Sequence, residues 1–353
     1  MQFVYQPNSQ RIIFGAGTLK QLPDEVALLG IKRPMIISTE FQKDMAESTK
    51  ELLGEGFESS IFAKAVMHVP RDSINAIMAE IEANNNDGCV CVGGGSTIGL
   101  GKAVALETGL PSIVVPTTYA GSEMTPIWGI TEDGIKTTGR DQKVLAKTVI
   151  YDPELTVTLP DFISGPSGIN AIAHCVEALY AENKNPVISL MSEEGIKALA
   201  ESLPVVVVEP DNMKARSKAL YGAWLAGTAL GTVGMSIHHK LCHTLGGSFN
   251  LPHAEVHSVI IPHATKYNQE DASEAMAAIA RALNTTPDDA AGALFDLLSK
   301  VGAPTTLEAI GMKEEDLDKA AEIALSKPYY NPREVTLEGV KELLKNAYSG
   351  IRP

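Results

Sequence analysis

The sequence has 353 residues, of which 44% are hydrophobic and 20% are charged, a balance typical of a globular protein. This length exceeds that of a typical single domain, so we expect two domains with a cleft between them. The net charge of -14 and the pI near 5.1 exclude a broad basic surface of the kind that binds nucleic acid or anionic membranes.

The cysteines and the N-terminal segment indicate a cytoplasmic protein. Cys89, Cys91, Cys175 and Cys242 form neither paired CxxC motifs nor a dense disulfide framework, which favours a reducing compartment. The segment MQFVYQPNSQRIIFG lacks the features of a signal peptide, and the chain has no apolar run long enough to span a membrane. We therefore expect a soluble protein without a membrane or nucleic-acid partner.

Short β-rich runs alternate with helical stretches in the first part of the chain. Residues 72–84 carry apolar side chains at helical spacing, and the β-rich runs lie at residues 35–38, 60–62, 88–92, 112–115 and 148–151. This alternation predicts an α/β, Rossmann-like N-terminal domain with a buried parallel sheet over residues 1–158.

The character of the sequence changes after Asp152-Pro153. Alanine-rich and leucine-rich segments predict an all-α C-terminal domain over residues 159–353. Residues 205–208 are four valines bracketed by Pro204 and Pro210, and we interpret them as a short connector or a helix start. We find no internal repeat.

A glycine-rich turn follows the run at 88–92 and leads into a helical segment. Glycines let backbone N–H groups approach phosphate oxygens, and a helix N-terminus adds positive potential. The pattern differs from the usual dinucleotide fingerprint and from the nucleotide-triphosphate loop, and a purely structural turn is the alternative. We predict that the loop binds the diphosphate of a dinucleotide, through Gly93, Gly94, Gly95, Ser96 and Thr97.

A second loop, residues 116–125, follows the next predicted strand. Ligands of α/β proteins bind at the carboxyl ends of strands, which favours contact of this loop with ribose or nicotinamide, although any loop is rich in Ser, Thr and Gly. The candidate cofactor contacts here are Thr117, Thr118 and Ser122. Near the end of the first predicted strand, Glu40 offers a carboxylate to an adenosine ribose, which would favour NADH over NADPH; an exposed surface glutamate is the equal alternative.

Six of the eight histidines fall between residues 238 and 263. His239 and His243 are spaced i,i+4 and share one face if this segment is helical, and His253 would fold back from a loop. Such crowding indicates a reaction centre, with either a divalent metal or metal-free acid, base and anion ligands. Ordinary polar residues paired with the backbone or water are the alternative.

Together, the glycine loop, the Pro-Thr-Thr segment at 116–118 and the histidine cluster resemble the iron-containing alcohol dehydrogenase superfamily over nearly the whole chain. Residues 116–129, with 136–141 following, closely resemble the maleylacetate reductases within it. The resemblance implies reduction of the carbon–carbon double bond of maleylacetate to 3-oxoadipate, with NADH or NADPH, in the catabolism of aromatic compounds. It also implies a homodimer, the commonest closed assembly.

The superfamily's metal ligands, one aspartate and three histidines, correspond by this resemblance to Asn170, His174, His239 and His253. Asparagine in place of aspartate removes the only anionic ligand and much of the affinity for a cation, so we expect that no metal is required. Our hypothesis is that His243 donates a proton to the substrate while His174, His239 and His253 anchor its oxygens.

Other polar side chains are candidate contacts for a dicarboxylate substrate. We assign Asn170, Tyr119 and Arg140 to the substrate and Lys136 to the cofactor. A vestige of the lost metal site is the equal alternative for Asn170. A solvated charged hairpin is the alternative for Lys136 and Arg140. Residues 329–333 resemble an Asn-Pro-Arg motif of the superfamily, which we interpret as structural.

Two other functions stay open at this point. One is a metal-dependent alcohol or aldehyde dehydrogenase of the same superfamily, which metal content would reveal. The other is a non-catalytic nucleotide-binding module whose histidines merely pack a domain interface, which an absence of hydride transfer would reveal.

Overall fold

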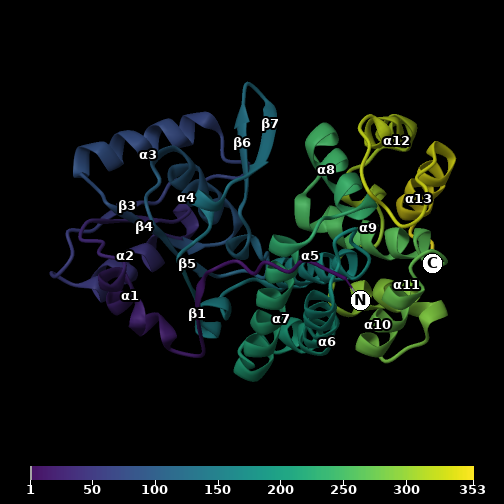
Figure 1. Cartoon of the computed structure of the whole chain (residues 1–353), viewed down its shortest axis with the longest axis horizontal. Helices are drawn as coiled ribbons and strands as arrows, with labels where there is room; N and C mark the ends of the chain where they lie inside the picture. The colour runs from purple at the N-terminus through teal and green to yellow at the C-terminus, as the bar shows by residue number, and fades with distance from the viewer. Residues whose placement is uncertain (1) are drawn as a thin grey trace. The chain divides into compact units, whose positions relative to one another are not determined.

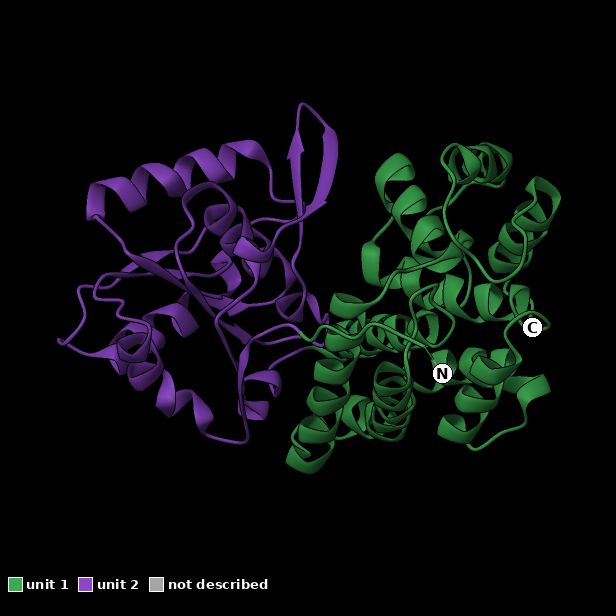
Figure 2. Ribbon diagram, in the orientation of Figure 1, with its two compact units in different colours: residues 1–7, 160–353 green, residues 8–159 purple. Residues whose placement is uncertain are grey.

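The computed structural model describes residues 2–353, which divide into two compact units. One unit comprises residues 8–159, and the other comprises residues 160–353 together with the N-terminal segment that ends at Pro7 (Figure 2). The N-terminal segment belongs to the second unit because Tyr5 packs against buried Ala178 and its neighbours.

The unit of residues 8–159 is built on a six-stranded parallel sheet with the spatial order β1-β8-β5-β4-β2-β3 (Figure 1). Every residue of β2, β4, β5 and β8 is buried, as expected for a parallel sheet covered on both faces. The predicted α/β class is therefore confirmed. The strands are β1 Arg11–Phe14, β2 Pro34–Ile37, β3 Ser60–Phe62, β4 Gly88–Gly93, β5 Ser112–Pro116 and β8 Thr148–Tyr151.

The helices of this unit connect the parallel strands. They are α1 Leu22–Leu28, α2 Lys43–Leu53, α3 Arg71–Asn84 and α4 Gly95–Thr108. The predicted helix at 72–84 is confirmed by α3, which buries Ile74, Ile77 and Ile81.

Two elements of this unit were not predicted as strands. The edge strand β1 is short and buries only Ile13, so it carries no clear alternation. The other is an antiparallel hairpin, β6 Ile127–Glu132 with β7 Ile135–Arg140. The hairpin carries Lys136 and Arg140, both exposed, in agreement with the alternative that we gave for these residues.

The order of the strands places the two candidate cofactor loops. Chain direction across the sheet reverses between β2 and β4, because β2 leads outward to β3 whereas β4 leads through β5 to β8. The glycine loop follows β4, and Glu40 follows β2, so both lie at the carboxyl ends of the strands that flank the reversal. This is the position where open α/β sheets bind ligands.

The unit of residues 160–353 is helical, which confirms the predicted all-α class. Its α-helices are α5 Asp161–Leu179, α6 Pro186–Val208, α7 Met213–Thr232, α8 Ile237–Phe249, α9 His253–Tyr267, α10 Ser273–Leu283, α11 Ala290–Lys300, α12 Leu317–Leu325 and α13 Leu337–Ser349. Helix α5 is buried from Ser164 to its end, so it forms the central element of this unit.

The interpretation of residues 205–208 as a connector or helix start was wrong. They form the last turn of α6, which runs through Pro204. Proline interrupts only one backbone hydrogen bond, and Val206 is fully buried against the core. The packing of this apolar turn therefore outweighs the helix-breaking tendency of Pro204.

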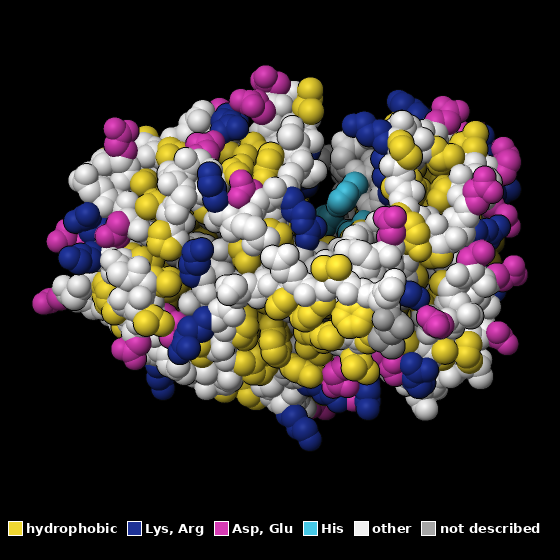
Figure 3. All heavy atoms as spheres, in the orientation of Figure 1, with side chains coloured by type: hydrophobic (Ala, Val, Ile, Leu, Met, Phe, Trp, Pro, Cys, Tyr) yellow, Lys and Arg dark blue, Asp and Glu magenta, His cyan; other side chains and the backbone are white. Residues whose placement is uncertain are grey.

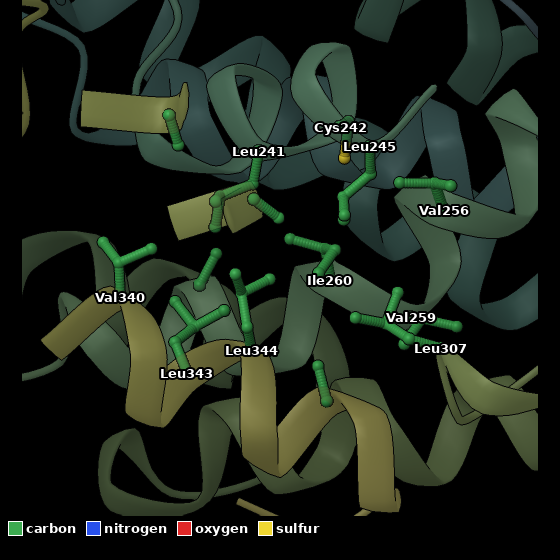
Figure 4. Packing of buried hydrophobic residues seen from close by; sticks show 14 of the residues in the cluster. Leu241, Cys242, Leu245, Val256, Val259, Ile260, Leu307, Val340, Leu343 and Leu344 are labelled. Atoms are coloured by element: carbon green, nitrogen blue, oxygen red, sulfur yellow. The ribbon is translucent and has the colours of Figure 1, made fainter. Parts of the chain in front are cut away.

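One hydrophobic cluster holds α8 and α9 against the C-terminal helices α12 and α13 (Figure 4). Leu241 and Leu245 of α8 meet Val256 and Ile260 of α9, with Leu344 of α13 in the same cluster. Burial of each such side chain contributes about 1.5–3 kcal/mol. The cluster thus fixes the two helices that carry most of the histidines.

The Asn-Pro-Arg motif clamps the C-terminal end of α9. The side-chain amides of Asn331 and Asn268 donate to each other at 2.7 and 3.0 Å. Arg333 donates to the carbonyl of Tyr267 at 3.1 Å and lies 4.3 Å from the centre of its ring. These contacts support the structural interpretation of the motif.

Charged side chains of both signs lie on the surface. On the face shown in Figure 3, acidic and basic side chains are interspersed and no extended basic area is visible. None of the helices within residues 2–353 combines the length and apolarity that a membrane span requires.

Candidate active site

Three polar side chains of α5 share one helical face. Asn170, His174 and Glu177 are spaced i, i+4 and i+7, which places them one above another. All three are buried, and Glu177 is completely shielded from solvent. A carboxylate at such a depth requires strong hydrogen-bond donors.

Glu177 obtains these donors from the N-terminus of α8. Its carboxylate accepts the backbone N–H groups of Ser236 at 3.0 Å, His238 at 2.8 Å and His239 at 3.3 Å. It also accepts Nδ1–H of the His239 ring at 2.6 Å. The first N–H groups of a helix lack partners within the helix and favour negative charge, so Glu177 acts as a long-range cap of α8.

The contact with Glu177 determines how the His239 ring is used. With its proton on Nδ1, a neutral His239 presents the lone pair of Nε2, which lies 2.9 Å from Nδ1 of His174. His174 therefore donates to His239 through Nδ1, so a neutral His174 ring carries its lone pair on Nε2.

The four histidines predicted to be catalytic lie in the same cluster of the helical unit. His239 and His243 are both on α8, with ring centres 6.1 Å apart, which confirms the predicted i,i+4 pair. His253 is the first residue of α9, not a loop residue, because Asn250 turns the chain in the left-handed conformation and α9 starts directly after Pro252. His243 and His253 are exposed, whereas His174 and His239 are buried.

A second layer of side chains lies beneath these histidines. His238 Nε2 and His257 Nδ1 are 2.9 Å apart, and Sγ of Cys242 lies 3.6 Å from His238 Nε2. Burial, followed by the charges of neighbouring histidines, holds the pKa values of His238 and His257 well below the usual range. The ring of His257 meets that of His253 edge-on, with centres 4.5 Å apart. A neutral inner layer therefore supports the outer histidines without adding charge.

The side chains at the superfamily's metal position include a close histidine pair and a neutral amide. Nδ1 of His174 and Nε2 of His239 lie 2.9 Å apart. Glu177, which holds His239 Nδ1, is committed to its four N–H donors. Asn170 brings a neutral amide whose Oδ1 is buried and has no hydrogen-bond partner within residues 2–353. That oxygen suits a ligand N–H or O–H donor at least as well as a cation.

The glycine loop has two structural glycines and one open position. Gly93 has a φ of +154°, and a Cβ there would lie 2.5 Å from the Thr97 hydroxyl. A Cβ on Gly94 would lie 2.8 Å from a methyl carbon of Thr118. Gly95, at the N-terminus of α4, has nothing within 4 Å of its Cβ position. Packing therefore explains the first two glycines, while the third leaves space for a phosphate beside the helix N-terminus.

Buried hydroxyl groups without partners line the same loops. Oγ1 of Thr97 and Oγ1 of Thr118 are buried and accept or donate no hydrogen bond in the described part of the chain. Thr117 lies nearby and binds the side-chain amide of Gln42 at 2.9 Å. Buried hydroxyls usually have partners, so these two fit the polar groups of a bound nucleotide.

Lys102 joins the glycine-loop helix to the second loop. Its buried ammonium lies within 2.6–3.2 Å of four oxygens, from Ser122 (two), Thr125 and Ile127. Burial lowers the pKa of Lys102 to about 7, and nearby Glu123 opposes this shift. Lys102 thus holds the loop that carries Thr117, Thr118 and Ser122 in register with α4.

The remaining predicted contacts lie elsewhere in the α/β unit. Tyr119 is fully buried within its loop, whereas Glu40 is exposed at the start of a short 3-10 helix. Lys136 and Arg140 are exposed on β7. Contact of these residues with substrate or cofactor stays a prediction.

Sequence reasoning missed Glu177, Lys102 and Gln42 as site residues. The sequence could have indicated Glu177, because this residue follows His174 by three residues and Asn170 by seven and so lies on the same face of a predicted helix. It could also have indicated Lys102, since a lysine nine residues after the first loop glycine falls on the buried side of an otherwise apolar helix. It could not have indicated Gln42, because its partner is distant in the sequence.

Sequence comparison matches the chain to two family descriptions. Residues 9–153 match "Iron-containing alcohol dehydrogenase", and residues 165–348 match "Fe-containing alcohol dehydrogenase family, C-terminal". The maleylacetate reductase of Sphingobium indicum is 50% identical over 353 residues, which cover 100% of this chain and 99% of that protein. The maleylacetate reductase of Burkholderia cepacia is 50% identical over 351 residues, with 99% of each chain covered.

Solved structures show the same similarity. A putative alcohol dehydrogenase from Ralstonia eutropha JMP134 is 54% identical, with a TM-score of 0.97 and coverage of 100% of this chain and 99% of that one. Maleylacetate reductase from Agrobacterium tumefaciens is 47% identical, with a TM-score of 0.96 and full coverage of both chains.

Glu177→Gln should destabilise the helical unit and reduce activity. The glutamine side chain keeps one oxygen acceptor, but its NH₂ group would face the backbone N–H donors at the start of α8. We therefore expect a loss of roughly 2–3 kcal/mol in the free energy of unfolding. Urea unfolding measures this loss, and turnover should fall because His239 is no longer held. Glu182→Gln, an exposed change just after the same helix, is the matched control. Equal stability of the two variants would contradict the capping role of Glu177.

Gly95→Ala should separate cofactor binding from folding. A methyl group fits at this helix start without a clash, so the melting temperature should stay unchanged. The same methyl group would occupy the space assigned to the phosphate, and the Kd for the reduced cofactor should rise roughly tenfold, about 1.4 kcal/mol. Fluorescence titration measures the Kd, with Gly56→Ala as the control at another open glycine. An unchanged Kd would place the diphosphate elsewhere.

Proposed function

Because the chain belongs to the iron-containing alcohol dehydrogenase family, a family of NAD(P)H-dependent oxidoreductases, we propose that it reduces maleylacetate to 3-oxoadipate with NADH or NADPH. The observation that carries the proposal is 50% identity over the full length to enzymes named maleylacetate reductase. With this substrate, the enzyme would act in the catabolism of aromatic compounds. We also propose that the protein is cytoplasmic and that it assembles as a homodimer.

The α/β unit supplies the groups that the cofactor needs. The open position at Gly95 and the N-terminus of α4 suit the diphosphate, and the hydroxyls of Thr97 and Thr118 suit polar groups of the same ligand. Glu40, at the end of β2, is our candidate for the adenosine ribose, with NADH preferred over NADPH. Thr117, Ser122 and Lys136 complete the proposed cofactor contacts.

The reaction that we propose is a conjugate reduction. A bound reduced nicotinamide would supply a hydride to the double-bond carbon beside the carboxylate, and the electron pair of the double bond would move towards the ketone to give an enolate. A proton then adds to the carbon beside the ketone, which completes the saturated product. The residues therefore have two tasks, to stabilise an enolate oxygen and to donate one proton.

Our assignment gives these tasks to the histidines of the helical unit. We assign His174 and His253 to the substrate oxygens, and Asn170 adds an amide with an unused oxygen. Both ring nitrogens of His239 already contact Glu177 and His174, so His239 positions His174 and does not anchor the substrate itself. His243 donates the proton because it is exposed on α8 beside this group. Tyr119 and Arg140 are assigned to the substrate from the α/β unit.

A metal-independent reaction fits these residues best. Asn170 at the superfamily's metal position is a neutral amide and brings no anionic ligand for a metal. N–H donors can stabilise an enolate oxygen, whereas a carbonyl that accepts hydride directly is stabilised more strongly by a cation. A metal-dependent alcohol dehydrogenase is the second candidate, because a structure that is 54% identical is described as a putative alcohol dehydrogenase. Similarity to enzymes over the whole chain argues against a non-catalytic module.

Enzyme dialysed against a chelator, with metal absent by elemental analysis, should oxidise NADH at its full rate when maleylacetate is added. The expected product is 3-oxoadipate, identified by mass spectrometry. Activity that disappears and returns only with iron or zinc would favour the metal-dependent candidate. A protein that leaves maleylacetate unchanged in either state would overturn the proposed reaction.

His243→Ala should lower kcat roughly 10²–10⁴-fold, the range typical for loss of a general acid, while the Kd for NADH stays unchanged. Stopped-flow kinetics and fluorescence titration measure the two quantities. His68→Asn, an exposed histidine of the α/β unit, is the control. A parallel loss of cofactor binding and turnover would argue that His243 is not the proton donor.

A further inference from the structure

Lys240 is a cation beside the proposed catalytic histidines. It follows His239 directly on α8 and precedes His243 by three residues, which places it about 60° from His243 around the helix axis. The residue is half-buried.

Lys240 differs from other half-buried lysines in its surroundings. Lys341 of α13, for example, lies 3.2 Å from the carboxylate of Asp318. No carboxylate within residues 2–353 pairs with Lys240, and its described side-chain contact is with the ring of Tyr329, 5.8 Å from the ring centre. Partial burial of an ammonium without a counterion is unfavourable, so this position favours an external anion.

Tyr329 supplies a second unused polar group at the same place. Its hydroxyl oxygen is buried and has no hydrogen-bond partner in the described chain. Burial, followed by the proximity of Tyr267 and Glu177, raises the pKa of this phenol, so the hydroxyl keeps its proton and is available as a donor. The ring of Tyr329 therefore places an unused hydroxyl donor close to the Lys240 ammonium.

We propose that Lys240 and Tyr329 form a carboxylate subsite, which binds one of the two carboxylates of the substrate and makes Lys240 a determinant of specificity for dianions. A carboxylate accepts one hydrogen bond from the ammonium and one from the phenol, a pairing stronger than neutral hydrogen bonds. This inference rests on the proposed function, because it assumes a dicarboxylate substrate.

The charge of the whole protein gives this subsite its importance. A net charge of -14 repels a dianionic substrate at long range. Lys240 places an ammonium group on α8 directly beside the proposed catalytic histidines, where it can attract a substrate carboxylate.

The experiment combines variants of Lys240 with shortened substrates. Lys240→Met and Lys240→Gln should raise KM for maleylacetate at least tenfold while the KM for NADH stays unchanged, and Lys240→Arg should restore most of the affinity. Tyr329→Phe should raise the same KM less. Lys266→Met, an exposed lysine on α9, is the control.

Two monocarboxylate analogues, in each of which a methyl group replaces one carboxylate, identify the group that Lys240 binds. Wild-type enzyme should use both poorly. With Lys240→Met, the penalty for one of them should disappear, because the enzyme no longer contacts the missing carboxylate.

The outcomes separate this inference from the proposed function. Wild-type enzyme that fails to reduce maleylacetate would overturn both. Active wild-type enzyme together with an unchanged KM in Lys240→Met and Lys240→Gln, or with both analogue penalties retained in these variants, would overturn the subsite alone. Melting temperature and the Kd for NADH, measured for each variant, show that the fold is intact.

Discussion

The buried carboxylate of Glu177 is the constraint on which the histidine site depends. It lies on the central helix of its unit, and it is the group that compensates the unpaired N–H groups at the start of α8. The same carboxylate fixes the proton of His239 on Nδ1, which in turn makes His174 the donor in the pair. The position of α8 and the hydrogen-bonding state of two histidines therefore follow from one buried charge.

Charge is distributed in layers around this carboxylate. His238 and His257 are buried and neutral, since solvent is absent and neighbouring imidazoles oppose a further positive charge. The outer histidines, His243 and His253, are exposed. This division agrees with the proposed role of His243 as the proton donor.

The cofactor side of the enzyme depends on contacts between loops. Gly94 permits close approach of Thr118, Gln42 binds Thr117, and Lys102 holds the oxygens of the second loop. These contacts preorganise two loops that follow adjacent strands. The free energy of nucleotide binding is then not reduced by the cost of ordering them.

Local patterns in the sequence predicted most of the parallel sheet and the helical class of the second unit. The apolar runs at 88–92 and 112–115 predicted β4 and β5, residues 72–84 predicted α3, and the i,i+4 spacing of His239 and His243 predicted one helical face. These features depend on periodicity over a few residues, which any stretch of sequence displays directly. The resemblance to a known family added the correspondence of Asn170 to a metal ligand.

Tertiary structure alone decided which side chains meet. Glu177 reaches the start of α8 across about sixty residues of sequence, a contact that no local pattern encodes. The four valines at 205–208 are helical because Val206 finds a buried position, although Pro204 argues locally for a break. In each case, burial and long-range hydrogen bonds outweighed the local preference, because their free energies exceed the small differences in conformational propensity between residues.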